Sequence, residues 1–243
     1  MPSKLHRLFV KSPLGMGAEI ALDGEQAHYL LNVLRLSQGD KILLFNGRDG
    51  EWCATLGATS KKKAQAVLEH QTRVQDEGPD LHYLFAPLKR ARLDYMAQKA
   101  TEMGASVLRP VITRRTVAEK VKTARLFANA VEAAEQCGIL RVPEVHEPEK
   151  LSKVLDRWDA ERLLIFADET APAASPLETL SAQGPRPLAV LIGPEGGFEP
   201  EERAALLAKP FVVPISLGPR VMRADTAAVA ALALVNAMLG DWR

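Results

Sequence analysis

The chain has 243 residues, of which 47% are hydrophobic and 25% are charged, a balance typical of a globular protein that can bury a core. This composition excludes a disordered tail and a collagen-like rod. Lysine and arginine number 31 against 30 aspartates and glutamates, so the formal net charge of +1 gives no overall basic excess for a nucleic-acid partner.

The charge is unevenly distributed along the chain. Residues up to Arg73 include 10 basic and 7 acidic side chains, while the remainder has 21 and 23. A small basic module ahead of a slightly acidic one is typical of a protein that docks on a polyanion with one part and performs chemistry with the other. An imbalance of this size also arises by chance, so the distribution only directs attention to the first module.

The cysteines and the apolar segments indicate a protein of the reducing cytoplasm. Cys53 and Cys137 form no Cys-x-x-Cys pattern, so neither a disulfide framework nor a metal site is predicted. The apolar run Leu8–Val10 is too short for the core of a signal peptide. Ala224–Gly240 is rich in alanine but interrupted by polar residues, which predicts a buried helix and no membrane span.

The first part of the chain reads as short strands. They are predicted at Glu19–Leu22, Lys41–Asn46, Trp52–Gly57 and Ala64–Glu69. A turn rich in Asn and Gly, Asn46–Gly50, joins the second strand to the third, and a helix over Glu25–Leu34 is capped by Asp23 or Gly24. This pattern predicts a small β-barrel-like domain over residues 1–74, followed by a polar linker at Gln75–Asp80.

From Leu81 onward, strands alternate with helices. Strands are predicted at Leu81–Leu88, Val107–Thr113, Leu163–Ala167, Leu188–Ile192 and Phe211–Leu217. Helices are predicted at Leu93–Met103 and Ala124–Cys137, from about Pro200, and from Ala224. Such alternation predicts an α/β domain over residues 75–243, with a mostly parallel sheet that is covered on both faces and binds ligands at the carboxyl ends of its strands.

The segment Leu188–Phe198 (LAVLIGPEGGF) joins an apolar strand to a glycine-rich turn. Three glycines around Pro194 let the backbone approach a ligand closely. Neither dinucleotide nor P-loop spacing is present, and the acidic residues behind the turn would repel a diphosphate. An adenosine without phosphate suits this loop better, and Glu195 favours a cation. The alternative is a simple tight turn between strand and helix.

A second loop, Ile215–Ala227 (ISLGPRVMRADTA), also follows a strand and contains Gly-Pro. Its two arginines are either solvated or paired with the acidic segment Glu199–Glu202, and Asp225 or Thr226 is placed to cap the following helix. Two strands that each end in a Gly-Pro turn of unusual polarity favour one shared site over two independent turns.

Basic residues elsewhere suit phosphate contacts. Lys89, Arg90 and Arg92 follow a strand end. In the first module, Arg7 and Arg35 lie at ends of elements, and Lys61–Lys63 lie on a turn. Each set is equally typical of solvated surface charges.

Five segments in this order resemble the RsmE family of 16S rRNA (uracil-N3)-methyltransferases, within the SPOUT class of trefoil-knotted enzymes. The match spans nearly the whole chain, and the five segments together are highly specific. They are AHYLLNVLRLSQGD (Ala27–Asp40), KRARLDYMAQKATEMGA (Lys89–Ala105), VEAAEQCG (Val131–Gly138), LIGPEGGF (Leu191–Phe198) and LGPRVMRADTA (Leu217–Ala227).

The resemblance implies a fold and a donor site. The first domain is expected to be PUA-like and RNA-binding, and the second to be a SPOUT-type parallel sheet with a C-terminal trefoil knot that binds S-adenosyl-L-methionine and works as a homodimer. The residues expected to bind the methyl donor are Leu191, Gly193, Glu195, Gly196, Leu217, Gly218, Met222, Ala224 and Thr226. Those expected to bind the 16S rRNA or small ribosomal subunit are Arg7, Arg35, Lys89 and Arg92.

The chemistry at uracil N3 assigns roles to the second loop. N3 carries a proton at neutral pH and is a poor nucleophile, so the enzyme must stabilise the anion. Arg220 or Arg223 is placed to do so by charge-assisted hydrogen bonds. Asp225 is a conceivable proton acceptor, and a cap of the helix is an equal alternative.

Two departures from the family pattern affect substrate contacts. The chain has Gly138-Ile139-Leu140-Arg141 where the family has Gly-Arg, and Arg223-Ala224-Asp225-Thr226 where the family has Glu at the third position. The closest rival function is a SPOUT ribose 2′-O-methyltransferase acting on rRNA or tRNA. A nucleotide-dependent oxidoreductase lacks its glycine fingerprint, and an RNA-binding protein without catalysis would have a degraded donor loop.

Overall fold

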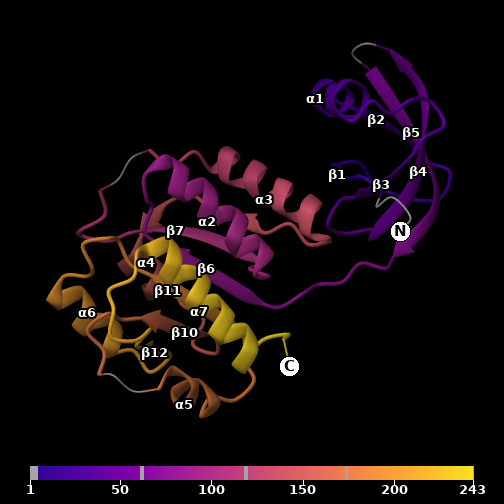
Figure 1. Ribbon diagram of the computed structural model, residues 1–243. Coiled ribbons are helices and arrows are strands. Elements are labelled where there is room, and N and C mark those ends of the chain that lie inside the picture. The colour runs from indigo at the N-terminus through magenta and orange to yellow at the C-terminus, as the bar shows by residue number, and fades with distance from the viewer. Residues whose placement is uncertain (1–4, 61–62, 118–119, 173–174, 243) are drawn as a thin grey trace. The chain divides into compact units, whose positions relative to one another are not determined.

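The computed structural model describes residues 5–60, 63–117, 120–172 and 175–242, and Figure 1 shows its elements. The chain forms two compact units. The first comprises Met1–Glu77 together with Ala134–Val142, and the second comprises Gly78–Ala133 and Pro143–Arg243. The predicted division after residue 74 lies close to the first change of unit, but the return of 134–142 to the first unit was not predicted. Lys61 and Lys62 lie outside the described residues.

The first unit contains a five-stranded sheet. In chain order its strands are β1 (Arg7–Phe9), β2 (Glu19–Leu22), β3 (Lys41–Phe45), β4 (Glu51–Ser60) and β5 (Lys63–Arg73). They lie side by side in the order β1-β3-β4-β5-β2, with only β1 and β3 parallel among the described pairs. Apolar residues of alternating positions, such as Ile42 and Leu44, are fully buried in the core of this unit.

One helical segment packs on this sheet. It consists of α1 (Gly24–His28) and a wider π-helical turn, η1 (Tyr29–Val33), and together they match the predicted helix over Glu25–Leu34. Asp23 caps it as predicted: the Gln26 backbone N–H donates to Asp23 Oδ1 at 2.8 Å, and the Asp23 N–H donates to Gln26 Oε1 at 3.2 Å.

The second unit contains a parallel sheet. Its strands are β6 (Leu81–Phe85), β7 (Val107–Ile112), β8 (Glu144–Val145), β9 (Glu149–Lys150), β10 (Leu163–Ala167), β11 (Leu188–Ile192) and β12 (Val212–Ile215). The spatial order is β12-β10-β11-β6-β7-β8, and β9 also pairs with β7. Every described pairing in this sheet is parallel, which confirms the predicted sheet type.

Helices cover both faces of this sheet. They are α2 (Arg90–Glu102), α3 (Thr123–Cys137), α4 (Leu151–Asp156), α5 (Pro176–Ser181), α6 (Pro200–Leu207) and α7 (Ala224–Met238). Residues of α4 and α6 join one apolar cluster with Leu84 and Leu191 of the sheet, whereas α7 contacts β11 and packs beside α2 (Figure 1). Strand β11 is buried along its whole length, because helices lie on either side of it. No helix in the described part of the chain has the length and hydrophobicity needed to span a membrane.

Candidate functional site

A cavity of about 420 Å³ lies where three adjacent strands of the second unit end. Its walls are the loop after β10 (166–170), the glycine loop after β11 (192–198) and the loop after β12 (217–224), with Arg92 of α2 and Arg203 of α6 at its sides. This is where ligands of parallel sheets gather, and the volume falls in the range of small-molecule sites. The shared site predicted from the two Gly-Pro turns is therefore present.

The glycine loop is shaped by two close approaches. A Cβ at Gly193 would lie 2.4 Å from the ring of Phe198, which packs edge-on against Phe166 with ring centroids 5.1 Å apart. Gly197 has a φ of +68°, and a Cβ there would lie 2.4 Å from Glu169 Oε1. A side chain at Gly193 would therefore displace the Phe198 ring, and the positive φ of Gly197 favours glycine, so the loop has bare backbone at both positions.

The loop after β10 is held by a buried ion pair. The Asp168 side chain is 3% exposed and accepts from Arg203 Nη2 at 2.8 Å and from Thr170 Oγ1 at 2.9 Å. Burial favours the neutral acid, but the hydrogen bonds from Arg203 and Thr170 outweigh it and hold the pKa of Asp168 below its ordinary value. Sequence reasoning missed this wall of the site, although its polar residues directly follow a buried strand.

Arg220 and Arg223 both line the cavity and are exposed. Among the residues that the structure describes, no carboxylate forms a salt bridge with either guanidinium, and neither donates a hydrogen bond. The glutamates that were alternative partners bind other arginines: Glu199 accepts from Arg115 Nε at 2.8 Å, and Glu201 pairs with Arg114. The two arginines are therefore available to a ligand.

The side chain of Arg92 forms ion pairs at the rim of the same cavity. Arg92 pairs with Glu195, and its Nε lies 3.9 Å from Asp225 Oδ2. Asp225 Oδ1 accepts from the Thr226 backbone N–H at 2.9 Å, within the first turn of α7. The N-cap position of α7 is occupied by Arg223, so the prediction of Asp225 or Thr226 as the cap was wrong.

Most of the residues predicted to bind the donor line this cavity. The six that do so are Gly193, Glu195, Leu217, Gly218, Met222 and Ala224. Three others do not line it. Leu191 is fully buried in the core beneath the loop, the carbonyl of Gly196 accepts from Arg115 Nη1 at 2.7 Å, and Thr226 is exposed on α7. These three contribute to the walls only through their neighbours in sequence.

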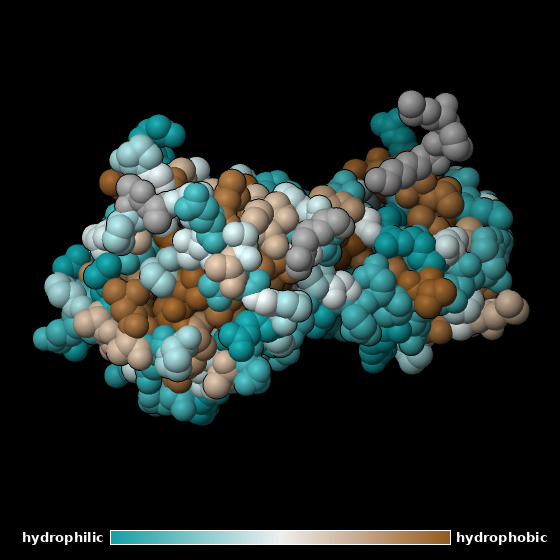
Figure 2. Space-filling model, turned by 90° about the horizontal axis from the view of Figure 1, so that it is seen from below, coloured by the Kyte–Doolittle hydropathy of each residue, from teal (hydrophilic) through white to brown (hydrophobic). Residues whose placement is uncertain are grey.

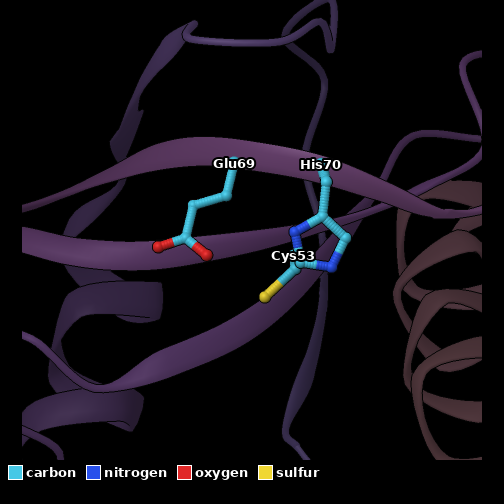
Figure 3. Close-up of side chains that lie close together, drawn as sticks. All are labelled: Cys53, Glu69 and His70. Carbon is cyan, nitrogen blue, oxygen red and sulfur yellow. The ribbon is translucent and has the colours of Figure 1, made fainter.

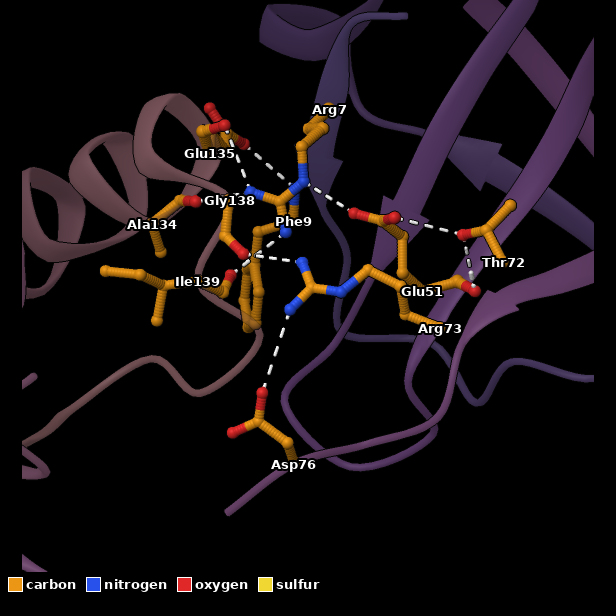
Figure 4. Close-up of polar contacts among 10 residues, drawn as sticks. All are labelled: Arg7, Phe9, Glu51, Thr72, Arg73, Asp76, Ala134, Glu135, Gly138 and Ile139. Atoms are coloured by element: carbon orange, nitrogen blue, oxygen red, sulfur yellow. Dashed lines mark hydrogen bonds and ion pairs between the residues drawn. The ribbon is translucent and has the colours of Figure 1, made fainter. Parts of the chain in front are cut away.

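Arg7, predicted to contact RNA, is instead a buried residue of the first unit (Figure 4). Its Nε donates to Glu51 at 2.6 Å, and its terminal nitrogens donate to backbone carbonyls in the last turn of α3 and to that of Ile139, just after α3, at 3.0 Å. The guanidinium also lies 4.4 Å from the centre of the Phe45 ring. A cation enclosed in this way cannot reach a phosphate, so the prediction for Arg7 is corrected.

The other predicted RNA-contacting cations lie at the surface. Arg35 is exposed and has a φ of 59°, just after η1, and Lys89 is exposed at the N-cap of α2. Arg92 is partly exposed. Arg141, next to the family departure at Ile139, donates from Nη1 to the carbonyl of Glu77 at 2.6 Å.

One group of possible metal ligands occurs in the described part of the first unit. The ligand atoms of Cys53, Glu69 and His70 lie within 4.8 Å of one another on β4 and β5 (Figure 3). The Glu69 carboxylate already accepts from Lys41 Nζ at 2.8 Å and from Thr55 Oγ1, and burial raises the pKa of the Cys53 thiol. An ammonium group beside a protonated thiol disfavours a cation, so we assign no metal to this group.

Comparisons with known proteins agree with this geometry. A family model described as an RNA methyltransferase domain matches residues 76–236, and one described as an RNA methyltransferase PUA domain matches residues 22–69. Ribosomal RNA small subunit methyltransferase E of Rickettsia conorii is 30% identical over 240 residues, which cover 98% of this chain and 97% of the relative. The protein of that name from Synechocystis is 31% identical over 238 residues, 96% of this chain and 78% of the relative.

Solved structures show the same similarity over the whole chain. Ribosomal RNA small subunit methyltransferase E from Neisseria gonorrhoeae, bound to S-adenosyl methionine, superposes with a TM-score of 0.88 at 26% identity, covering 99% of this chain and 100% of that one. A methyltransferase from Legionella pneumophila, also with bound cofactor, has a TM-score of 0.85 at 29% identity and covers 98% and 99%. The chain therefore belongs to the family of RNA methyltransferases that includes ribosomal RNA small subunit methyltransferase E.

Proposed function

We propose that this protein transfers a methyl group from S-adenosyl-L-methionine to N3 of a specific uridine in the 16S rRNA of the small ribosomal subunit. The observation that carries the proposal is the cavity at the ends of β10, β11 and β12, which is lined by the glycine loop and by two arginines that pair with no carboxylate among the described residues. The names of the relatives and the cofactor bound in the solved neighbours support it.

The cavity suits this methyl donor. Phe166, Phe198 and Met222 provide apolar surface, and the glycine loop offers backbone groups that can pair with an adenine edge. Glu169 lines the same space, where its carboxylate favours a cationic ligand, whereas the Glu195 carboxylate is paired with Arg92. When bound, the donor supplies a methyl group activated by its positively charged sulfur.

The arginines are suited to the acceptor. The N3 proton passes to the proposed acceptor Asp225, at the rim of the cavity, and its loss spreads negative charge onto the flanking carbonyl oxygens of uracil. Arg220 or Arg223 can hold that charge by hydrogen bonds. Because no described carboxylate pairs with these two arginines, their N–H groups need not break an existing ion pair to bind the uracil oxygens. Fixing N3 in line with the methyl group supplies a further entropic advantage.

We further propose a cytoplasmic homodimer whose second domain is knotted at the loops after β11 and β12. Large side chains exposed on the second unit support an interface between copies: Val221, which lines the cavity, is 87% exposed, and Tyr95 of α2 is 43% exposed. On the face in Figure 2, brown apolar patches on the second unit alternate with hydrophilic residues. The PUA-like first unit is proposed to bind RNA, with Arg35 among its contacts.

Analysis of the product nucleoside tests the proposed reaction. The purified protein is incubated with the methyl donor and either naked 16S rRNA or small-subunit particles, and the RNA is digested and analysed by mass spectrometry. N3-methyluridine is the expected product. A 2′-O-methylnucleoside would establish the rival SPOUT reaction, and the absence of any methylated nucleoside on both substrates would overturn the proposal.

A further inference from the structure

The second unit has a separate groove, of about 790 Å³, beside the first turns of α2 and α3. Four cations line it: Lys89, Lys120, Lys122 and Arg125. Asp94, the one carboxylate among the lining residues that the structure describes, accepts from Arg125 Nε at 2.8 Å and Nη2 at 2.5 Å. No salt bridge joins any of the three lysines to a carboxylate within the described ranges of the chain. We call this feature the basic groove.

We infer that the basic groove binds the phosphodiester backbone of the single-stranded RNA segment that carries the target nucleotide. This inference rests on the proposed function, because it assigns a contact to the same RNA substrate. It adds Lys120, Lys122 and Arg125 to the residues expected to bind RNA and separates them from the methyl-transfer cavity.

The backbone adds to the charge of the side chains. Helices α2 and α3 have 13 and 15 residues, and both begin at the groove, where Lys89 and Lys122 precede their first turns. The Lys89 side chain forms no cap hydrogen bond, so N–H groups of the first turn of α2 are not satisfied by a side-chain cap. Two helix N-termini and four cations around one cavity favour an anion far more than a row of solvated lysines does.

The mixed lining of the groove favours a nucleic acid over a free anion. Besides the four cations it includes the apolar residues Ala91, Leu93 and the buried Leu126. A nucleotide has this division, with an apolar ring face and a charged phosphate. Binding of single strands generally combines a cationic path for the backbone with apolar surfaces under the bases.

The groove also lies next to the proposed site of chemistry. Ala91 and Leu93 line the groove, whereas Arg92, between them in sequence, lines the methyl-donor cavity. The first turn of α2 therefore lies between the basic groove and the methyl-donor cavity. RNA bound along the groove would bring a flanking nucleotide to the entrance of the cavity, where Arg92 is paired with Glu195.

Charge reversal of the two lysines before α3 tests the groove. The variant Lys120→Glu/Lys122→Glu is compared with wild type for binding to a labelled single-stranded fragment of 16S rRNA across a series of salt concentrations. Loss of two phosphate contacts is expected to raise the RNA Kd about tenfold or more and to reduce the slope of log Kd against log salt by about 1.4. The donor Kd, measured by calorimetry, and the Tm should stay unchanged.

A matched control changes the same charge elsewhere in the second unit. Lys150→Glu/Lys153→Glu alters two exposed lysines outside the groove and should leave RNA binding as in wild type.

Equal RNA affinity and salt slope in the groove variant and wild type would overturn the inference. Unchanged binding to the RNA fragment, with methylation lost only on assembled particles, would also overturn it by assigning the groove to a ribosomal protein. Failure of wild type to methylate any RNA would instead reject the proposed function, while the binding measurement still decides the groove.

Discussion

At the scale of single residues, the arginines of the second unit divide into those with carboxylate partners and those without. Arg114 and Arg115 pair with glutamates at the start of α6, and Arg203 of α6 pairs with Asp168, so these ion pairs tie the loops after β7 and β10 to α6. Arg220 and Arg223 line the donor cavity and form no such pair among the described residues. A cation left unpaired beside a ligand cavity is suited to hold negative charge that develops during the reaction.

We expect Arg223→Ala to abolish methyl transfer while donor binding stays largely intact. Removing one preorganised hydrogen-bond donor that stabilises a developing anion typically lowers kcat by about 10² to 10³. Transfer of a tritiated methyl group to RNA measures turnover, and calorimetry measures donor affinity. Arg114→Ala is the matched control, because Arg114 is exposed, pairs with Glu201 and does not line the cavity. Unchanged turnover in Arg223→Ala would contradict the assigned role.

At the scale of elements, the loop after β10 depends on the charge of Asp168. The folded pKa of Asp168 is lower than its ordinary value of 3.8, because the hydrogen bonds from Arg203 and Thr170 outweigh the effect of burial. A depressed acid pKa contributes stability above the unfolded pKa, and this contribution is lost as the pH falls through the folded pKa. The loop is therefore held most firmly at neutral pH.

Asp168→Asn should lower the free energy of unfolding by about 2 kcal/mol at pH 7, the typical contribution of a hydrogen bond to a charged group. The difference from wild type should stay constant between about pH 5 and 8 and shrink below the ordinary aspartate value of 3.8. Urea unfolding at each pH measures it. A difference that grew toward low pH would show that the Asp168 carboxylate does not stabilise the fold.

Elements with a clear local pattern in the sequence were predicted, and elements without one were missed. Continuous apolar runs with clear ends predicted β10 and β11 to the residue. Strand β1 and helices α4 and α5 were missed, because elements of three or six residues show no hydrophobic period. The donor loops were found because glycine and proline mark them, whereas the wall around Asp168 contains neither.

Arg7 shows a different limit of sequence reasoning. The charge of Arg7, its place at the end of an element and the family resemblance suggested a surface contact with RNA. The partners that bury Arg7 are remote in sequence, 44 residues away at Glu51 and 132 away at Ile139. A local sequence pattern does not indicate contacts between residues so far apart in the chain. The same contacts explain why 134–142 belongs to the first unit, where Ala134 and Leu140 form a small apolar cluster with Phe45.

At the scale of the whole molecule, Arg7 joins segments that are far apart along the chain. Arg7→Met should lower the free energy of unfolding by about 3 to 5 kcal/mol, because it leaves the Glu51 carboxylate buried without its cation. Chemical denaturation measures the change. The double variant Arg7→Met/Glu51→Leu should recover part of the loss, since it removes the unpaired charge as well. A single variant as stable as wild type would contradict this role.

The contacts of Arg7 with 134–142 affect any test of whether the first unit binds RNA and the second binds the methyl donor. Deletion of residues through Arg73 should weaken RNA binding far more than donor binding, because the described residues that line the donor cavity all lie between Arg92 and Ala227. The deletion also removes the partners of 134–142, so a lower Tm is expected.

The full-length variant Arg35→Glu therefore accompanies the deletion. Because Arg35 is exposed, this substitution should lower RNA affinity and leave the donor Kd and the Tm unchanged. Filter binding measures RNA affinity and calorimetry measures donor affinity. Equal losses of both in the deletion, together with wild-type RNA binding in Arg35→Glu, would contradict an RNA-binding first unit.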